Sequence, residues 1–312
     1  MNKLFKFLHE IYRFKSQQNF DDLKFLIGQN SILASRARYA QIQFLHEAEV
    51  KIFSQWGEDG IIDYLLHILK ISKPRILEIG VGDFTECNSR FAAEFMNASV
   101  YMVDINKELV DKVINKNLYW KTTLYPRVDR VTPDNAQSHF ESALVKMHGI
   151  DLLSIDIDGN DFWVLEALEL KKVSIIICEY NPIYGSKIAC TILRNDNYDR
   201  SKSHFSYLHF GMSLRAAILL LKRKGFIFVG ANLVGNNAFF VREEFRSQIK
   251  LQIPDLNQLD FFVDWRIRES RSREGNLNFL SLDDSRKEIQ DCSVYDIEAQ
   301  KIVKVRDIKH VS

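Results

Sequence analysis

The chain has 312 residues, enough for one large domain or for one domain with smaller additions. Its hydrophobic content of 46% and its charged content of 27% are ordinary for a globular protein. A net charge of +1 gives no electrostatic case for nucleic acid or an anionic membrane as the main partner. Composition thus excludes the strongly basic binding proteins and leaves function to local motifs.

Signals for export and for a membrane span are weak in this sequence. Charged residues interrupt every apolar run of the N-terminus, unlike the continuous apolar core of a signal peptide. No segment approaches the roughly 18 apolar residues that suggest a transmembrane helix. None of the four cysteines forms a Cys-x-x-Cys pair, which favours free thiols in a reducing compartment. We expect a cytoplasmic protein without a transmembrane segment.

Three regions are predicted along the chain. Residues 1–51 form a helical N-terminal extension, residues 52–245 an α/β core, and residues 246–312 a polar C-terminal extension of mixed helix and irregular structure that packs on the core. In the first region the apolar side chains recur at helical spacing: Leu4, Phe7, Leu8, Ile11 and Phe14. Such a segment can touch a membrane or a partner. Docking on its own domain or on a second subunit is favoured, so a homo-oligomer through the N-terminal helices is one expectation.

Strands and helices alternate through the core. The predicted elements in chain order are a helix over 61–71, a strand over 76–79, a helix over 86–97, a strand over 99–103, a helix over 107–116, a strand over 121–125, a helix over 133–146, a strand over 151–156, a helix over 161–169, a strand over 173–179, a long loop over 181–210, a helix over 214–224 and strands over 226–230 and 237–241. The last two strands are too close for a parallel crossover and should form a hairpin. The order predicts a doubly wound, mostly parallel, seven-stranded Rossmann-like α/β sheet closed by an antiparallel hairpin.

The first predicted strand runs into a glycine turn that indicates a nucleoside site. Gly80 and Gly82 follow this strand, Glu78 lies two positions before the first glycine, and the second strand ends at Asp104. Glycine lets the backbone approach a ligand, and an acid at that strand end can accept hydrogen bonds from both ribose hydroxyls. The structural alternative is a tight turn and a helix N-cap at Asp104. The turn lacks the third glycine of the dinucleotide fingerprint, which disfavours a nicotinamide-dependent oxidoreductase.

A second group of polar residues follows two neighbouring strands. Asp156 and Asp158 lie at the end of the fourth strand, and Glu179 and Asn181 at the end of the fifth. Because open α/β sheets bind ligands outside the carboxyl ends of their strands, these side chains are expected to meet at one rim. One carboxylate could act as general base on a substrate hydroxyl, or several with Asn181 could hold Mg²⁺ or another divalent cation. The structural alternative assigns Asp158 to a turn and Asp161 to a helix cap.

The predicted loop over 181–210 follows this rim and is rich in aromatic and hydrogen-bonding residues. Substrate contacts are predicted there at four positions: Asn181, Tyr184, His204 and His209. Such side chains suit a sugar or another polyhydroxylated acceptor. The alternative is a solvated surface excursion.

Five motifs carry a family resemblance: Ser54–Gly60, Leu77–Gly82, Leu153–Trp163, Glu179–Pro182 and Gly235–Val241. Together they resemble the class I S-adenosylmethionine-dependent methyltransferases, and more narrowly a bacterial FkbM-like branch often associated with surface-polysaccharide genes. The resemblance implies S-adenosylmethionine as the cofactor. The contacts that it implies are Glu78, Gly80 and Gly82 at the amino-acid end, Asp104 at the ribose, Ile105 against the adenine, Asp129 at the adenine edge, and Gln55 in a loop folded over the cofactor.

Motifs and resemblance lead to one main prediction. The chain is predicted to be an S-adenosylmethionine-dependent O-methyltransferase that acts on a sugar or a polysaccharide-related acceptor. Asp156, Asp158 and Glu179 are the predicted catalytic residues, which handle the hydroxyl proton directly or through a metal. The alternative is a non-catalytic methyltransferase-fold assembly or binding module in a glycan-synthesis complex.

Overall fold

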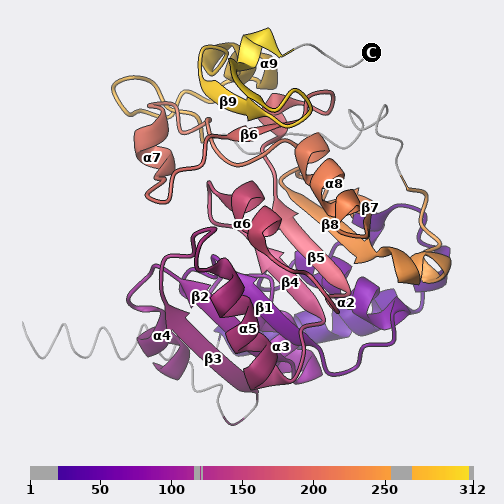
Figure 1. Ribbon diagram of the computed structural model, residues 1–312. Helices are drawn as coiled ribbons and strands as arrows, with labels where there is room; N and C mark the ends of the chain where they lie inside the picture. Colours follow the sequence, from indigo (N-terminus) through magenta and orange to yellow (C-terminus); the bar gives the residue numbers. More distant parts are fainter. Residues whose placement is uncertain (1–19, 116–119, 121, 254–268, 309–312) are drawn as a thin grey trace, which may run out of the picture.

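The computed structural model describes residues 20–115, 120, 122–253 and 269–308. A seven-stranded sheet forms its centre, with the strands β1 (Arg75–Ile79), β2 (Ser99–Asp104), β3 (Thr123–Val128), β4 (Leu152–Ile155), β5 (Ile175–Glu179), β7 (Phe226–Ala231) and β8 (Asn237–Arg242). In space their order is β3-β2-β1-β4-β5-β8-β7, and β8 runs antiparallel to both of its neighbours (Figure 1). The predicted doubly wound sheet closed by an antiparallel hairpin is confirmed.

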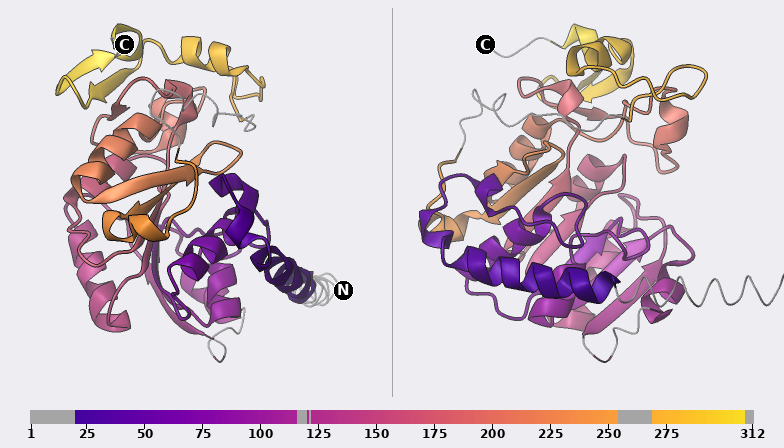
Figure 2. Two further views of the ribbon diagram at one scale, coloured as in Figure 1. Left: turned by 90° about the vertical axis from the view of Figure 1, so that its right-hand side faces the viewer. Right: turned by 180° about the vertical axis from the view of Figure 1, so that it is seen from behind.

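The parallel strands are nearly continuous aliphatic runs because helices cover both faces of the sheet. One face packs under α5 (Ala136–Met147), α6 (Asp161–Ala167) and α8 (Leu214–Arg223). The other face packs under α2 (Glu58–Ile68), α3 (Arg90–Met96) and α4 (Leu109–Asn115). Residues 20–36 form a helix outside this second layer (Figure 2). Two ion pairs tie this helix down, Asp21 with Arg90 at 2.6 Å and Arg36 with Asp63 at 2.5 Å.

A second, antiparallel sheet lies at the end of the molecule near the C-terminus (Figure 1). Its strands are β6 (Cys190–Ile192), β9 (Ser293–Asp296) and β10 (Lys301–Lys304), in the order β10-β9-β6. The short helices around it are η3 (Pro182–Tyr184), α7 (Arg200–Ser203), α9 (Leu282–Glu288) and η6 (Val305–Asp307). The described residues also form the 3-10 turns η1 (Tyr39–Gln41), η2 (Leu45–Ala48) and η4 (Glu243–Gln248).

This second sheet corrects two predictions. The loop expected over 181–210 contains η3, β6 and α7, and the region expected to be helical and irregular contains β9 and β10. Strands of three or four residues are too short to show a period of two, and β6 finds its partner β9 about a hundred residues further along the chain. Such pairing leaves no local signal.

Two further expectations concern the ends of the chain. Within the described ranges, every helix falls short of the length and apolar character that a bilayer crossing requires. The helical pattern predicted for residues 4–14 lies outside the described residues. The three-region division of the chain stays a prediction.

Candidate functional site

A cavity of about 370 Å³ opens at the carboxyl ends of β1, β2 and β4. Its walls bring together seven residues that the sequence singled out: Gly80, Gly82, Asp104, Ile105, Asp129, Asp156 and Asp158. Val103, Val131 and Ile157 add apolar surface. Sheets of this type bind ligands at this edge, and the volume falls within the roughly 300–1,000 Å³ of small-molecule sites.

The walls of this cavity are strongly acidic. Six carboxylates line it: Glu86, Asp104, Asp129, Asp156, Asp158 and Asp196. Among the described residues of its lining, Arg130 is the only basic side chain. A concave surface with this balance concentrates cations and repels anions. The pyrophosphate of a dinucleotide is therefore a poor match, whereas a ligand that carries positive charge is a good one.

The two glycines of the turn have different physical roles. Gly80 has a φ of +88°, and a Cβ there would lie 1.5 Å from the backbone oxygen of Asp156. Even alanine would therefore push β1 away from the loop that follows β4. Gly82 has a φ of +62°, but a Cβ there would meet no heavy atom within 4 Å. Gly80 thus serves the packing of the sheet, and Gly82 borders open space.

Two acids beneath the mouth of the cavity are oriented by short hydrogen bonds. The carboxylate of Asp104 accepts the backbone N–H groups of Gly82 and Asn106, each at 2.7 Å. The carboxylate of Asp129 lies 2.9 Å from Nε2 of His139. A carboxylate can accept about four hydrogen bonds, so lone pairs of both acids stay free for hydroxyl or amino donors of a ligand.

Two residues predicted to contact a cofactor do not line this cavity. Glu78 is buried, and its oxygens accept the N–H groups of Asn88 at 2.8 Å and Ser89 at 3.0 Å. Burial raises the pKa of the Glu78 carboxyl although these bonds favour its charged form. Gln55 lies in the loop before α2, where its backbone oxygen accepts a hydrogen bond from Lys51. Glu78 therefore holds the loop after β1 in place through hydrogen bonds to its backbone, on the side away from the cavity.

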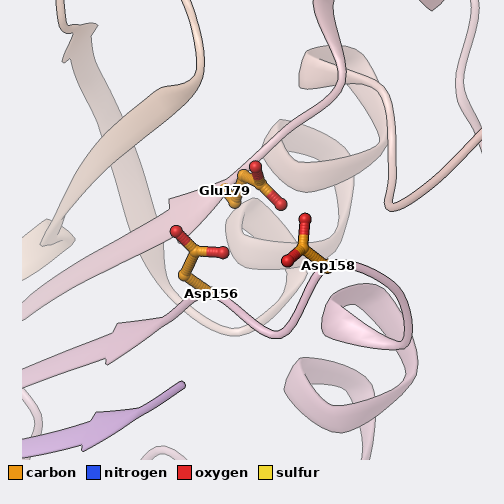
Figure 3. Close-up of side chains that lie close together, drawn as sticks. All are labelled: Asp156, Asp158 and Glu179. Atoms are coloured by element: carbon orange, nitrogen blue, oxygen red, sulfur yellow. The ribbon is translucent and has the colours of Figure 1, made fainter. Parts of the chain in front are cut away.

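Three carboxylates converge beside the cavity, at the ends of β4 and β5. Asp156, Asp158 and Glu179 each offer one oxygen, and these three oxygens lie within 4.8 Å of one another. Figure 3 shows the three side chains pointing toward a common centre. Glu179 is only 7% exposed, and its Oε2 is buried without a hydrogen-bond partner among the described residues. A buried carboxylate oxygen without a hydrogen-bond partner is costly unless the group binds a proton or a cation.

The electrostatics of this acid cluster follow from its burial. Desolvation, and then repulsion from neighbouring carboxylates, hold the pKa values of Asp156 and Glu179 well above their usual range. Both groups consequently take up a proton more readily than an ordinary side-chain carboxylate. A cluster of this kind can hold a hard divalent cation through its oxygens or accept a proton from a substrate hydroxyl.

Arg200 balances part of this negative charge, and sequence analysis missed it. Its guanidinium lies 2.8 Å from Asp158 Oδ1 and also pairs with Glu269. It donates to the backbone oxygen of Tyr207 at 2.7 Å and stacks 3.7 Å from the ring centre of Phe210. The position is 42 residues from Asp158 in a segment without periodic pattern, so no local signal marked it.

The turn between β4 and α6 differs from the predicted cap. Asp158 has a φ of +55°, as expected for a turn residue. Asn160 occupies the N-cap position of α6, and Asp161 instead accepts the N–H groups of Ile157 at 3.0 Å and Gly159 at 2.9 Å. Asp161 therefore braces the loop that presents Asp156 and Asp158, rather than capping the helix.

The predicted role of Asn181 as a ligand for metal or substrate is not supported by its contacts. Its amide nitrogen donates to the backbone oxygens of Leu208 at 2.9 Å and Phe210 at 3.0 Å. Its amide oxygen accepts the N–H of Ile183 at 3.1 Å. Asn181 is fully buried, so its hydrogen bonds hold in place the start of the segment over 181–210, called the insertion below because it separates β5 from α8.

The other three predicted substrate residues also lie outside the main cavity. Tyr184 is buried, with its hydroxyl 3.0 Å from Nδ1 of His209. Burial lowers the pKa of His209 to about 4, so this imidazole is neutral near pH 7. Nδ1 of His204 lies 2.7 Å from Oγ of Ser206. These side chains hold the insertion together, and the aromatic residue of this segment that does line the cavity is Tyr198.

Comparison with known proteins finds distant structural likenesses and no family. No protein-family model matches the sequence, and no curated protein does. Among solved structures, a precorrin-6y C5,15-methyltransferase from Geobacter metallireducens is 12% identical, with a TM-score of 0.33 over 62% of this chain and 90% of that chain. TrmK from M. capricolum, solved with S-adenosyl-homocysteine, is 13% identical, with a TM-score of 0.30 over 57% of this chain and 65% of that chain. A fibrillarin/Nop5p complex is 14% identical, with a TM-score of 0.33 over 56% and 78%. Identities and TM-scores this low concern the fold alone and carry no argument about ligand or reaction.

Proposed function

We propose that the chain is an S-adenosylmethionine-dependent methyltransferase. The observation that carries the proposal is the cavity lined by six carboxylates and one guanidinium at the carboxyl ends of the central strands. S-Adenosylmethionine carries a sulfonium, an ammonium group and one carboxylate, so its net charge is positive and suits this balance of charge. The anionic pyrophosphate of a nicotinamide cofactor does not.

The lining residues divide naturally between the parts of this cofactor. Asp104 would accept the ribose hydroxyls, with Ile105 and Asp129 bordering the adenine and Gly82 bordering the amino-acid end. When bound, the sulfonium supplies an activated methyl group, which leaves the chain to align an acceptor and to take its proton. Burial and the neighbouring carboxylates raise the pKa of Glu179, which makes it a stronger proton acceptor than an ordinary side-chain carboxylate.

We also propose a divalent cation at Asp156, Asp158 and Glu179. The three convergent carboxylate oxygens fit the ligand set of Mg²⁺ or a similar hard ion, and so does the buried Glu179 oxygen that has no hydrogen-bond partner in the described part of the chain. Such an ion would lower the pKa of a hydroxyl held beside it. Asn181 is left out of this ligand set because its amide is engaged with backbone groups.

The acceptor is proposed to be a sugar or a polysaccharide-related hydroxyl compound, so the enzyme would be an O-methyltransferase of the FkbM-like branch working in the cytoplasm. Support comes from the motifs of the sequence and from the aromatic side chain of Tyr198 in the cavity lining. A ring of this kind that also carries a hydroxyl group suits a polyhydroxylated ligand.

Isothermal titration with S-adenosylmethionine and S-adenosylhomocysteine tests the cofactor proposal. We expect binding of both, no binding of NAD⁺, and roughly tenfold weaker binding to Asp104→Asn, which replaces one charged acceptor oxygen with an amide nitrogen. Glu141→Gln on the exposed side of α5 is the matched control and should bind normally. No heat with either sulfur compound would overturn the proposal.

The alternative, a non-catalytic assembly module, draws on a different surface. The helix of residues 20–36 exposes five large apolar side chains: Phe20, Leu23, Leu26, Ile27 and Leu33. An exposed apolar stripe of this size indicates contact with another protein. Cofactor binding without turnover on fractionated glycans, together with stable association with a glycosyltransferase, would favour this alternative.

A further inference from the structure

A second cavity, of about 460 Å³, lies among residues 183–188, 286–290 and 305–308, apart from the residues that line the first. Three separate segments form it: the chain after β5, helix α9 and the residues that follow β10. Its apolar floor includes Ile183, Ile188 and Ile308, which are all buried. The proposed methyl transfer makes no use of this cavity.

The charged side chains on its walls have one sign. Lys187, Arg286, Lys287 and Arg306 line it, and among the described residues of the lining there is no carboxylate. This is the reverse of the main cavity. A concave wall with four cations and no acid favours an anion.

Arg286 is built into this cavity rather than loosely exposed. Its Nε donates to the backbone oxygen of Ile183 at 3.0 Å, across 103 residues of sequence. Its Nη2 lies 3.2 Å from the place that a Cβ at Gly185 would occupy, and Gly185 has a φ of +79°. The glycine therefore lets the guanidinium lie close over the backbone. A guanidinium held in this way presents a fixed fork of donors that matches a phosphate.

Neighbouring acids do not saturate these cations. Lys287 pairs with Asp284 at 3.1 Å and Arg306 with Asp291 at 2.5 Å, and all four of these side chains are more than half exposed. Arg286 lies 3.5 Å from Asp283. Exposed pairs of this kind contribute little to stability, so a doubly charged anion can compete for them. The structure gives Lys187 no ion pair with a described residue.

We propose that this second cavity binds the phosphate group of a small phosphorylated molecule. Arg286 and Lys187 hold the phosphate, Lys287 and Arg306 add positive charge at the rim, and the organic part of the ligand lies on the isoleucine floor. The volume exceeds what a single phosphate needs, which is why an organic part is included.

The test is an isothermal calorimetric titration of the full chain with inorganic pyrophosphate. We expect binding to the unaltered chain and at least tenfold weaker binding to the double variant Lys187→Gln/Arg286→Gln, since each substitution removes a charge-assisted hydrogen bond. The matched control is Lys222→Gln/Arg223→Gln, which makes the same charge change on the exposed end of α8. Its affinity should stay within about twofold of the unaltered chain.

Three outcomes would overturn the proposal. The first is no pyrophosphate binding to the unaltered chain, and the second is equal weakening in both double variants, which would reduce the effect to net charge. The third is binding only to vesicles that contain phosphatidic acid, which would assign the cations to a lipid surface. A urea unfolding midpoint close to that of Lys222→Gln/Arg223→Gln shows that Lys187→Gln/Arg286→Gln is folded, and this check does not depend on the methyltransferase proposal.

Discussion

Replacing Glu179 with glutamine should stabilise the protein in the absence of divalent cations. The substitution keeps the shape of the side chain but removes one of three carboxylates whose oxygens lie within 4.8 Å of one another. Two unit charges at such a distance repel by about 3–4 kcal/mol at an effective dielectric constant of ~20. Asp158 is 57% exposed and paired with Arg200, so much of its share is screened. We expect Glu179→Gln to raise the free energy of unfolding by roughly 1–2 kcal/mol at pH 8 in EDTA.

The dependence on pH has a definite sign. Both Asp156 and Glu179 have pKa values raised in the folded state. Their contribution to stability is therefore fully present below the unfolded pKa of about 4 and is lost as pH rises through the raised folded values. The unaltered chain in EDTA should lose stability over that rise, and Glu179→Gln should lose less.

Urea unfolding between pH 5 and 8 measures this difference, with and without Mg²⁺. Magnesium at about a hundred times its dissociation constant should stabilise the unaltered chain by roughly 2.7 kcal/mol and the variant far less. The control Glu141→Gln, on the exposed side of α5, should follow the unaltered chain. A variant that is less stable than the unaltered chain in EDTA at pH 8 would refute the reasoning, because Glu179 would then be held by a contact stronger than the repulsion.

Three further predictions follow from the same geometry. Arg200→Gln should tighten Mg²⁺ binding about tenfold in calorimetry, since a guanidinium beside the cluster repels a cation; unchanged or weaker binding would contradict this. Gly80→Ala should destabilise the fold by about 3 kcal/mol or more in urea unfolding, whereas Gly82→Ala should lose only about 1 kcal/mol because its Cβ has space; equal losses would remove the distinction between the two glycines. Leu23→Gln/Ile27→Gln should shift a dimer to monomer in light scattering if the exposed stripe joins two copies, and an unaltered monomeric mass in the parent chain would end that expectation.

The central sheet was accessible from sequence because its signals are local. Each parallel strand is a short aliphatic run, and the short connection between β7 and β8 dictates an antiparallel pair. The acid cluster was accessible for a related reason. Strand ends meet at one edge of a parallel sheet, so Asp156 and Glu179 could be expected together before their distance was known.

Contacts between distant segments could not be predicted in this way. Arg200 reaches Asp158 from an insertion whose fold depends on β9, and nothing near Arg200 in sequence records that pairing. Asn181 and Glu78 show a second limit of sequence reasoning, and their predicted ligand contacts stay predictions. Both have residue types that suit ligand binding, but their hydrogen bonds go to backbone groups that a sequence pattern does not reveal.

Because β6 pairs with β9, the C-terminal part of the chain helps to position residues beside the acidic cavity at the ends of β1, β2 and β4. In the described sheet, β6 has β9 as its neighbour, and the segment after β6 carries Tyr198 and Arg200. A chain cut before Ser293 would leave β6 with unpaired backbone groups on that edge. Arg200, which pairs with Asp158, would then lie in a loop without a fixed position. A truncation far from the glycine turn would therefore change the balance of charge at the acid cluster.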